Sequence, residues 1–339
     1  MNINISRTQF FLFLFVAQTG TVFISFQGPL IKAAGRDAWI IFLVAGLFHY
    51  ALLLFYERFY PSFILGPIMS WLYKGYWLFL TVTFISYVDY TLAAWAFPNT
   101  PQFIVIALMV IISLYANLSR AETTMNLSVL LIPLIPLFLF FLALSWRDLE
   151  WTYLFPSIKA SVAQWGEGML KAQYAFIGIE LFLIYRRFVD PDRKVKGLPL
   201  FIYQMIWLLF FMFTILITTL FFAREDMLMI PEPLMYILKS QQVSFIERLD
   251  LFFIYIWMSW SIITITLFSF SALFVHRMHN KKHSKRDIII FHALLMLLPL
   301  FSLTKEATEK LQDSLVFAHL LFAIVLPVII ILVNRRKSI

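Results

Sequence analysis

The sequence predicts an all-α polytopic membrane protein. Of the 339 residues, 61% are hydrophobic and only 14% are charged, whereas soluble domains are about 45–50% apolar and about 25% charged. A soluble fold of this length could not bury so much apolar surface, so the composition argues against a soluble enzyme. The apolar stretches are continuous rather than alternating, which disfavours an outer-membrane barrel. At about 30 residues for a span and its loop, the length allows roughly ten or eleven transmembrane helices.

Breaks in hydropathy and turn residues divide the chain into about ten predicted spans. These spans are 8–31, 38–56, 75–97, 102–118, 123–145, 170–189, 199–223, 247–275, 287–304 and 311–333. Between the fifth and sixth, the amphipathic stretch 151–168 is expected to lie on the membrane surface. No long polar segment is left for a water-soluble domain. We therefore expect a single integral-membrane domain, 1–339, with halves of about 1–146 and 147–339.

The distribution of the 27 Lys and Arg residues predicts which loops face the cytoplasm. With the N-terminus inside, the two densest basic clusters both fall inside: Arg186, Arg187, Arg193, Lys194 and Lys196, then Arg277, Lys281, Lys282, Lys285 and Arg286. The positive-inside rule thus favours ten spans with both termini cytoplasmic, and an eleventh span would put one cluster outside. The net charge of +8 follows from this topology. No basic run with interleaved aromatics indicates nucleic acid, so the expected surrounding is the lipid bilayer.

Two predicted spans carry residues near their middles that loosen a helix. Span one contains Gln18, Thr19, Gly20 and Thr21, and span six contains Phe176, Ile177, Gly178 and Glu180. These spans are five apart, as expected if the two halves form a 5+5 inverted repeat whose halves each open with a discontinuous helix. The alternative is that these glycines serve only close helix packing.

In the inverted-repeat architecture, freed backbone groups at the breaks bind a small polar ligand. The predicted ligand-binding residues are Gln18, Thr19, Gly20, Thr21, Asp89, Phe176, Ile177, Gly178, Glu180, Ser259 and Trp260. Ionisable residues within spans are functional candidates by default, and Asp89 is expected to face the interior near span one or six. For Asp89 and Glu180 the alternative is an internal polar contact that only fixes helix packing.

Enzymatic and metal chemistry find little support in the sequence. The chain has no cysteine, which removes thiolate ligands and nucleophiles. His49, His292 and His319 are scattered, with no carboxylate at helical spacing beside them, so no metal site is predicted. The sequence contains no phosphate-binding glycine loop, zinc-protease motif or serine-nucleophile elbow. We expect neither an enzyme nor a cofactor.

Several short motifs follow one another along the whole chain. They are AGRDAWI at 34–40, FPNTP at 97–101, FIGIE at 176–180 and FIERLD at 245–250, followed by Trp257. In this order and spacing they resemble the spore germination permease family, the GerAB-type B subunits of nutrient germinant receptors. That family belongs to the amino acid–polyamine–organocation (APC) superfamily and is similar in fold to LeuT-type transporters. Structurally, Asp37 is expected to cap span two, and Asp250 to lie in the first turn of span eight.

The resemblance implies a membrane subunit that binds a small nutrient, most plausibly an amino acid, between spans one, three, six and eight. Ligand binding would shift the helix bundle, and this shift would be passed to A- and C-type partner subunits in the spore inner membrane or the bacterial cell membrane. A secondary transporter of an amino acid or similar solute, coupled to a proton or sodium, needs the same pocket and stays an alternative. A third hypothesis is a scaffold that only holds partner subunits.

Overall fold

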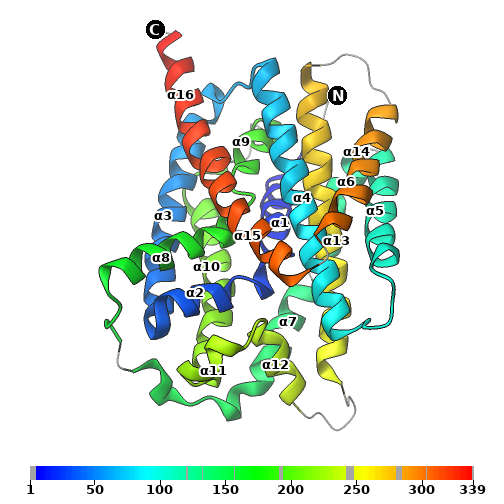
Figure 1. Cartoon of the computed structure of the whole chain (residues 1–339). Helices are drawn as coiled ribbons and strands as arrows, with labels where there is room; N and C mark the ends of the chain where they lie inside the picture. The colour runs from blue at the N-terminus through cyan, green and yellow to red at the C-terminus, as the bar shows by residue number, and fades with distance from the viewer. Residues whose placement is uncertain are drawn as a thin grey trace.

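The computed structural model describes residues 5–119, 121–131, 133–155, 157–190, 194–241, 248–279, 285–302 and 304–337. Every named element in these ranges is helical, and the described part of the chain holds only one isolated β-bridge, between Ile5 and Val189. The helices form one elongated bundle (Figure 1). The predicted all-α class is therefore confirmed.

Seven helical segments of the described chain are long and apolar enough to cross a membrane. They are Val22–Ser62, Pro67–Trp95, Thr123–Asp148, Val162–Phe188, Leu198–Phe221, Leu249–Met278 and Lys305–Arg336. The other three predicted spans coincide with shorter helices: α1 (Arg7–Thr19), α5 (Gln102–Leu118) and α14 (Lys285–Leu297). The polytopic membrane class is confirmed, and the number of crossings stays a prediction.

Four long helices run along the length of the bundle: α3 (Ala38–Phe59), α4 (Pro67–Trp95), α10 (Leu198–Phe221) and α13 (Leu249–His279). Helix α13 packs along α4, and α10 packs along α3, while α5 and α14 pack together beside α13. The fifth predicted span is divided into α6 (Ala121–Leu130) and α7 (Leu134–Ala143). Pro133, which lacks a backbone N–H and cannot continue a helix from the residues before it, precedes α7.

The first and sixth predicted spans are both interrupted. Helix α1 ends at Thr19, η1 (Val22–Ile24) follows, and α2 (Gln27–Ala34) turns away from the bundle axis (Figure 1). Helix α8 (Val162–Ala172) passes through η6 (Gln173–Phe176) to the short α9 (Leu181–Tyr185). Between η6 and α9, Gly178 has φ +100°, a conformation that side chains disfavour. The outer parts of the two spans, α2 and α8, lie side by side.

The second half of 151–168 forms the start of a longer candidate span, Val162–Phe188, and its location on the membrane surface stays a prediction. Helix α8 begins at Val162 and packs against both α2 and α3. Gly168 makes this possible, because a Cβ atom there would lie 3.1 Å from both Ala34 Cβ and Ile41 Cδ1. The amphipathic stretch is therefore partly the outer portion of the sixth span.

Asp37 also has a different role from the expected helix cap. Its backbone is helical (φ −83°, ψ 0°) and its side chain makes no capping bond to α3, whereas a capping residue is normally extended. The carboxylate instead accepts the backbone N–H groups of Ile158, Lys159 and Ala160 at 2.5–2.7 Å. Asp37 thus ties the start of α3 to the loop before α8, where Ile158 has φ +61°.

Asp250, an acidic residue of the motif at 245–250, lies at its predicted position. Asp250 is in the first turn of α13 and pairs with Arg248 at 2.8 Å. The remainder of that motif, residues 245–247, falls outside the described residues.

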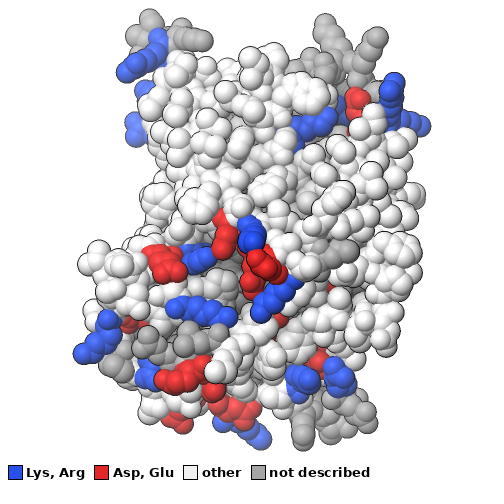
Figure 2. Space-filling view, in the orientation of Figure 1, with Lys and Arg blue, Asp and Glu red and all other residues white. Residues whose placement is uncertain are grey.

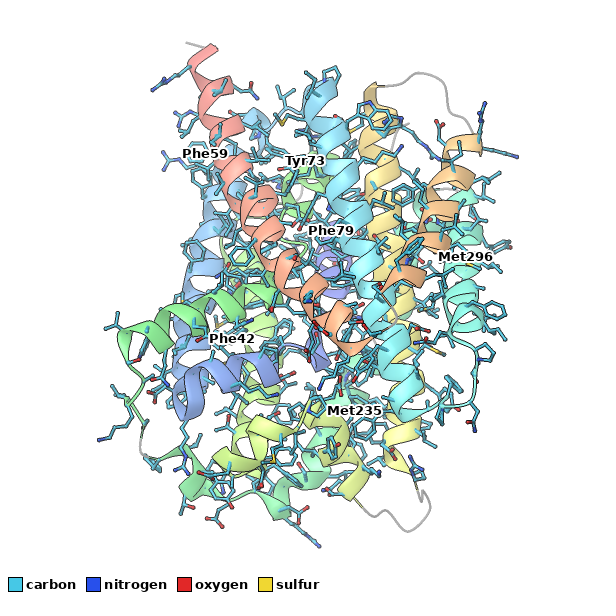
Figure 3. All side chains as sticks on the ribbon, in the orientation of Figure 1. Phe42, Phe59, Tyr73, Phe79, Met235 and Met296 are labelled. Atoms are coloured by element: carbon cyan, nitrogen blue, oxygen red, sulfur yellow. The ribbon has the colours of Figure 1, made fainter. Side chains whose placement is uncertain are left out.

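The last span is one bent helix made of α15 (Lys305–His319), the π-helical segment η9 (Leu320–Val325) and α16 (Leu326–Lys337). The short helices α11 (Arg224–Met229) and α12 (Pro233–Ser240) cover the end of the bundle opposite to the end of α16. Side chains fill the space between the ribbons (Figure 3): Phe42, Tyr73 and Met235 are fully buried there.

Candidate functional site

A cavity of about 360 Å³ opens on the face shown in Figure 2. Its walls come from α2, α4, α8 and α15, and from Pro231 and Glu232 just before α12. We call it the charged cavity, because its lining includes Lys32, Lys171, Lys305, Glu167, Glu232, Glu309 and Asp313. Figure 2 shows acidic and basic side chains gathered where α8 and α15 lie, well away from either end of the bundle.

Helix α15 supplies three of these seven charged residues, Lys305, Glu309 and Asp313, and further charged residues on its outer face. Lys171 of α8 pairs with Asp313 at 2.7 Å, and Lys310 pairs with Glu306 at 2.6 Å. In Figure 1, α15 begins about midway along the bundle. Charged side chains at that depth are tolerated only where they face water or protein. The charged cavity therefore brings water toward the middle of the bundle.

Glu232 is the most buried carboxylate of the lining, with 4% of the residue exposed. Its Oε2 accepts a hydrogen bond from Trp95 Nε1 at 3.5 Å. Burial raises the pKa of Glu232 above its ordinary value, and the Trp95 hydrogen bond and the charge of Lys305 partly oppose this. A cationic group in the cavity would provide the positive charge that stabilises an ionised Glu232 carboxylate.

The inner wall of the cavity is formed at the two helix interruptions. Ser25 and Phe26 come from the break between α1 and α2, and Tyr174 comes from η6. The Tyr174 hydroxyl accepts a hydrogen bond from Gln312 Nε2 at 3.3 Å. Tyr87 of α4 also lines the cavity, and its buried hydroxyl, which lies near Thr91 and Ser25, makes no well-aligned hydrogen bond among the described residues. A polar group of a ligand could pair with this hydroxyl.

Behind this wall, Gln18 belongs to a buried hydrogen-bond network. Tyr203 donates its hydroxyl to Gln18 Oε1. Gln18 Nε2 lies 3.1 Å from His49 Nε2 and 3.4 Å from the Phe176 carbonyl oxygen. His49 Nδ1 lies 2.7 Å from Gln204 Oε1, and Gln204 Nε2 donates to the Gly46 carbonyl at 2.9 Å.

These contacts fix the direction of each hydrogen bond. Because the Gln204 amide nitrogen donates to Gly46, its oxygen faces His49, and His49 Nδ1 must carry the proton. His49 Nε2 then accepts from Gln18, so the imidazole is neutral. The ring is also stacked on Trp207 at 4.1 Å. The network joins α1, α3 and α10 to the break at Phe176; the sequence analysis did not identify Gln204 or Tyr203, although both are polar positions in an apolar span.

The residues around Gly20 pack so closely that no space is left for a ligand beside it. A Cβ atom at Gly20 would lie 1.9 Å from Thr264 Oγ1 and 2.8 Å from Trp260 Cδ1. Thr264 Oγ1 donates to the Val16 carbonyl at 2.9 Å, and Thr19 Oγ1 donates to the Phe15 carbonyl at 2.6 Å. The Thr21 hydroxyl is buried without a partner in the described chain. This part of the predicted pocket holds α1 against α13.

The predicted residues of the sixth span lie directly across from Gln18. A Cβ atom at Gly178 would lie 3.1 Å from Phe268 Cζ and 3.4 Å from Gln18 Cγ. The Phe176 ring meets the His49 ring edge-on at 4.7 Å. Ile177 and Glu180 are fully buried. The two breaks thus meet in space, as the sequence analysis supposed, but they form a closed contact beside the charged cavity.

Asp89 and Ser259 lie apart from these contacts. Ser259 is exposed and donates to the Tyr255 carbonyl of its own helix at 3.0 Å. Asp89 is buried, and neither of its carboxylate oxygens has a hydrogen-bond partner among the described residues. Neither residue lines the charged cavity.

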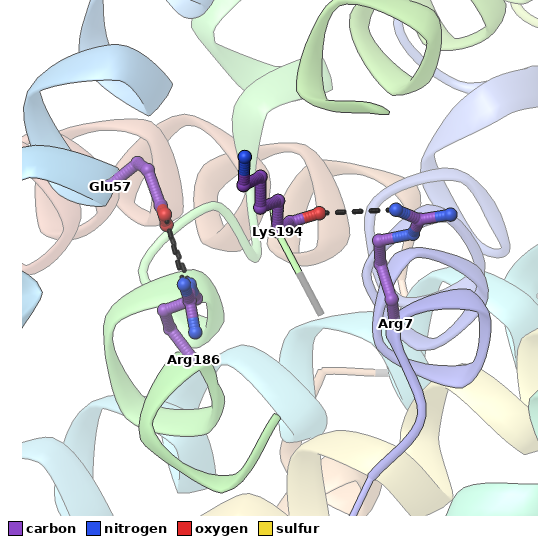
Figure 4. Close-up of polar contacts among 4 residues, drawn as sticks. All are labelled: Arg7, Glu57, Arg186 and Lys194. Carbon is purple, nitrogen blue, oxygen red and sulfur yellow. Dashed lines mark hydrogen bonds and ion pairs between the residues drawn. The ribbon is translucent and has the colours of Figure 1, made fainter. Parts of the chain in front are cut away.

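The end of the bundle away from α11 and α12 is closed by polar contacts (Figure 4). Arg186 donates to the Glu57 carboxylate at 2.6 and 3.0 Å and lies over the Tyr60 ring at 4.6 Å. Arg7 donates to the Lys194 carbonyl at 3.2 Å. These contacts tie α1 and α3 to the segment after α9, and we call this region the closed end.

Comparison with known proteins shows that this chain is similar in sequence to germination proteins. Residues 4–310 match the sequence model of a family described as "Spore germination protein". One similar protein is the spore germination protein GerQB of Bacillus cereus, which is 20% identical over 270 residues. The alignment covers 75% of this chain and 74% of GerQB. The family match includes both interrupted spans and the first six residues of α15.

Proposed function

Because the chain belongs to the spore germination protein family, we propose that it is a membrane subunit of a germinant receptor. In this role it binds a small nutrient and triggers germination. The observation that carries the proposal is the charged cavity, which is open to water and ends at both helix interruptions. Its volume of about 360 Å³ lies within the usual range for ligand pockets, about 300–1,000 Å³.

An amino acid suits the chemistry of this lining. Lys32 and Lys305 offer ammonium groups for a carboxylate, and the buried Glu232 offers a carboxylate for an ammonium group. Charge-assisted hydrogen bonds of this kind are roughly twice as strong as neutral ones. The Tyr87 hydroxyl adds a group that can orient the ligand.

A nutrient in the cavity would touch the helix that leads to the closed end. Helix α15 lines the cavity, and its continuation α16 donates from Asn334 to the Ser62 carbonyl at 3.0 Å. We infer that a tilt of α15 is passed along η9 to α16 and from there to A- and C-type partner subunits. The interrupted helices in residues 1–146 and 147–339 support an inverted-repeat arrangement. We propose that the protein lies in the spore inner membrane with both termini cytoplasmic, as the distribution of Lys and Arg predicts.

The proposal is tested by deleting the gene and exposing the spores to a panel of amino acids and other nutrients. We expect at least one nutrient to lose its response, measured as dipicolinic acid release. The wild-type gene should restore it, whereas Glu232→Gln or Lys305→Met should shift the dose–response curve to higher concentration. Lys310→Met is the matched control, because Lys310 lies on the same helix, is exposed and does not line the cavity.

An unchanged response to every nutrient after deletion would reject the receptor proposal. Uptake of the nutrient into liposomes by the purified chain alone would assign the cavity to a secondary transporter instead.

A further inference from the structure

Glu180 is a fully buried carboxylate at the break of the sixth span, two residues after Gly178 and directly before α9. Its Oε1 accepts a hydrogen bond from Trp77 Nε1 at 2.9 Å. Its Oε2 is buried and makes no well-aligned hydrogen bond among the described residues, although the Tyr76 hydroxyl and the backbone N–H groups of Gly178 and Glu180 lie near the carboxylate. One oxygen of this carboxylate is therefore satisfied, and the other is not.

The groups that face Glu180 from neighbouring helices carry no formal charge. Tyr56 of α3 and Tyr73 and Tyr76 of α4 interact with it electrostatically. Two of these hydroxyls are engaged elsewhere, since Tyr56 donates to the Ala323 carbonyl and Tyr73 to the Phe322 carbonyl of η9. The Tyr76 hydroxyl is buried and has no well-aligned partner in the described chain.

No ion pair in the described part of the chain includes Glu180. The guanidinium at the end of α9, Arg186, is bound to both oxygens of Glu57. The described residues also hold no group of three or more acidic, His or Cys side chains suited to a metal ion. An ionised and unpaired carboxylate in such a place costs several kcal/mol, and a group in this position usually neutralises instead.

We propose that Glu180 is a proton-binding site, with the proton on Oε2 in the arrangement described here. Protonation turns Oε2 from an unsatisfied acceptor into a donor, and the Tyr76 hydroxyl oxygen is available to accept. Trp77 then continues to donate to Oε1. The cluster of Glu180, Tyr76 and Trp77 becomes neutral and hydrogen-bonded without a cation.

The position of the proton links it to the closed end. Helix α9 spans only Leu181–Tyr185 and joins Glu180 directly to Arg186 of the closed end. Loss of the proton would leave a charge that only water or a cation can stabilise. Deprotonation should therefore favour arrangements in which the closed end admits water. This inference needs no nutrient and stands independently of the receptor proposal.

The proton is tested by infrared spectroscopy on the purified full-length chain in lipid nanodiscs. We expect wild-type protein to show the C=O stretch of a protonated carboxylic acid and Glu180→Gln to lack the corresponding component. Asp250→Asn is the matched control, because Asp250 is also buried but is paired with Arg248, away from the closed end; it should leave the band unchanged. The band should be measured from about pH 5 to about pH 9, the range in which buried carboxyl groups titrate.

A wild-type spectrum that matches Glu180→Gln throughout this range would overturn the proposal. If Glu180→Gln does not accumulate as folded protein, Glu180→Asp replaces it, since it keeps the carboxyl group in a shifted position. A displaced band then supports the proton on Glu180, and an undisplaced band contradicts it.

Discussion

The tautomer of His49 that carries its proton on Nδ1 completes a chain of hydrogen bonds. The chain runs from the Gly46 carbonyl through Gln204 and His49 to Gln18. Each bond of the network depends on the next, because the direction set at the Gly46 carbonyl fixes Gln204, then His49, then Gln18. Such networks hold their members strongly when complete and are costly when a member is removed. The hydrogen bonds of individual atoms thus decide how the break of span one is held.

Replacing His49 by Leu should leave Gln204 Oε1 unpaired and leave the Gln18 amide nitrogen with only its 3.4 Å contact to the Phe176 carbonyl. Buried groups without partners cost about 1–3 kcal/mol each, so the free energy of unfolding should fall by at least that amount. The measurement is reversible unfolding in mixed detergent micelles. Ser259→Ala is the control, since Ser259 is exposed and surface changes usually stay within about 0.5 kcal/mol. Equal stability of the two variants would contradict the network.

Gly20, directly after α1, and Gly75, within α4, are glycines in contrasting surroundings. A Cβ atom at Gly20 would meet Thr264 Oγ1 at 1.9 Å, whereas nothing lies within 4 Å of one at Gly75. Gly20→Ala should destabilise the protein by about 1–3 kcal/mol through overpacking. Gly75→Ala should be neutral or stabilise it by up to about 1 kcal/mol, because alanine favours the helix. The two melting temperatures test this, and a Gly20→Ala protein as stable as Gly75→Ala would show that α1 does not approach α13 so closely.

Residue positions were predicted from the sequence unequally well. Gly20, Gly178 and Gln18 could be identified, because glycine and polar residues in an apolar span are visible without the fold. Ser259 could not be distinguished from Trp260, since adjacent helix residues point about 100° apart and the sequence does not fix the rotation of a helix. The charged cavity was also missed, because its lining comes from segments far apart in the chain.

At the scale of single elements, short polar contacts control how the interrupted helices meet their neighbours. The side chains of Arg186 and Glu57 are only 11% and 8% exposed. Removing one partner of such a buried pair leaves an uncompensated charge. The segment that follows α9 is therefore held against α3 mainly by this pair.

Glu57→Gln should loosen the closed end. Since the chain has no cysteine, a single Cys at Ser271, which is hydrogen-bonded to Tyr185 at 2.9 Å, can report on it without background. We expect a water-soluble thiol reagent to react with this Cys faster in Glu57→Gln than in the otherwise wild-type chain. The double variant Glu57→Gln/Arg186→Gln should react more slowly than the single one, because no unpaired charge is left. Identical rates in all three proteins would rule out a closing role for the pair.

The elements themselves were largely predictable, and their contacts were not. Hydropathy located α3, α10 and α13 within about four residues of their bounds, since long apolar runs leave few other structures possible in lipid. It missed the first eight residues of α4, which begins at Pro67 rather than at 75. The amphipathic pattern of 151–168 could not show that α8 packs on α2, because packing through Gly168 depends on a distant partner. For the same reason, the sequence gives no sign that Asp37 binds the loop at 158–160.

At the scale of the whole molecule, charge and helix direction together describe how the chain sits in a membrane. Ile5 pairs with Phe188 and Asp190, Arg187 with the Phe63 carbonyl, and Asn334 with the Ser62 carbonyl. The start of α1 and the end of α16 therefore lie at the same end of the bundle (Figure 1). The described residues of the two basic clusters lie in the segment after α9, at the end of α13 and at the start of α14, all at that end of the bundle. The positive-inside rule predicts that this end is cytoplasmic.

Reporter fusions test this topology. A reporter fused after Lys196 and another fused after Lys285 should both be active only in the cytoplasm. A fusion after Asn99, in the connection between α4 and α5, should lie on the other side of the membrane. Either basic cluster on the outer side would contradict the ten-span arrangement and the inverted repeat with it.

The central claim is that the charged cavity binds a nutrient, and ligand-induced stabilisation of the purified full-length chain tests it most directly. A ligand at 100 times its Kd stabilises the folded state by about 2.7 kcal/mol, which raises the melting temperature measurably. We predict that at least one nutrient of the germination panel stabilises the wild-type chain and Lys310→Met equally, and that Glu232→Gln and Lys305→Met lose most of this stabilisation. Stabilisation by no nutrient, or stabilisation that both cavity variants retain in full, would contradict the account.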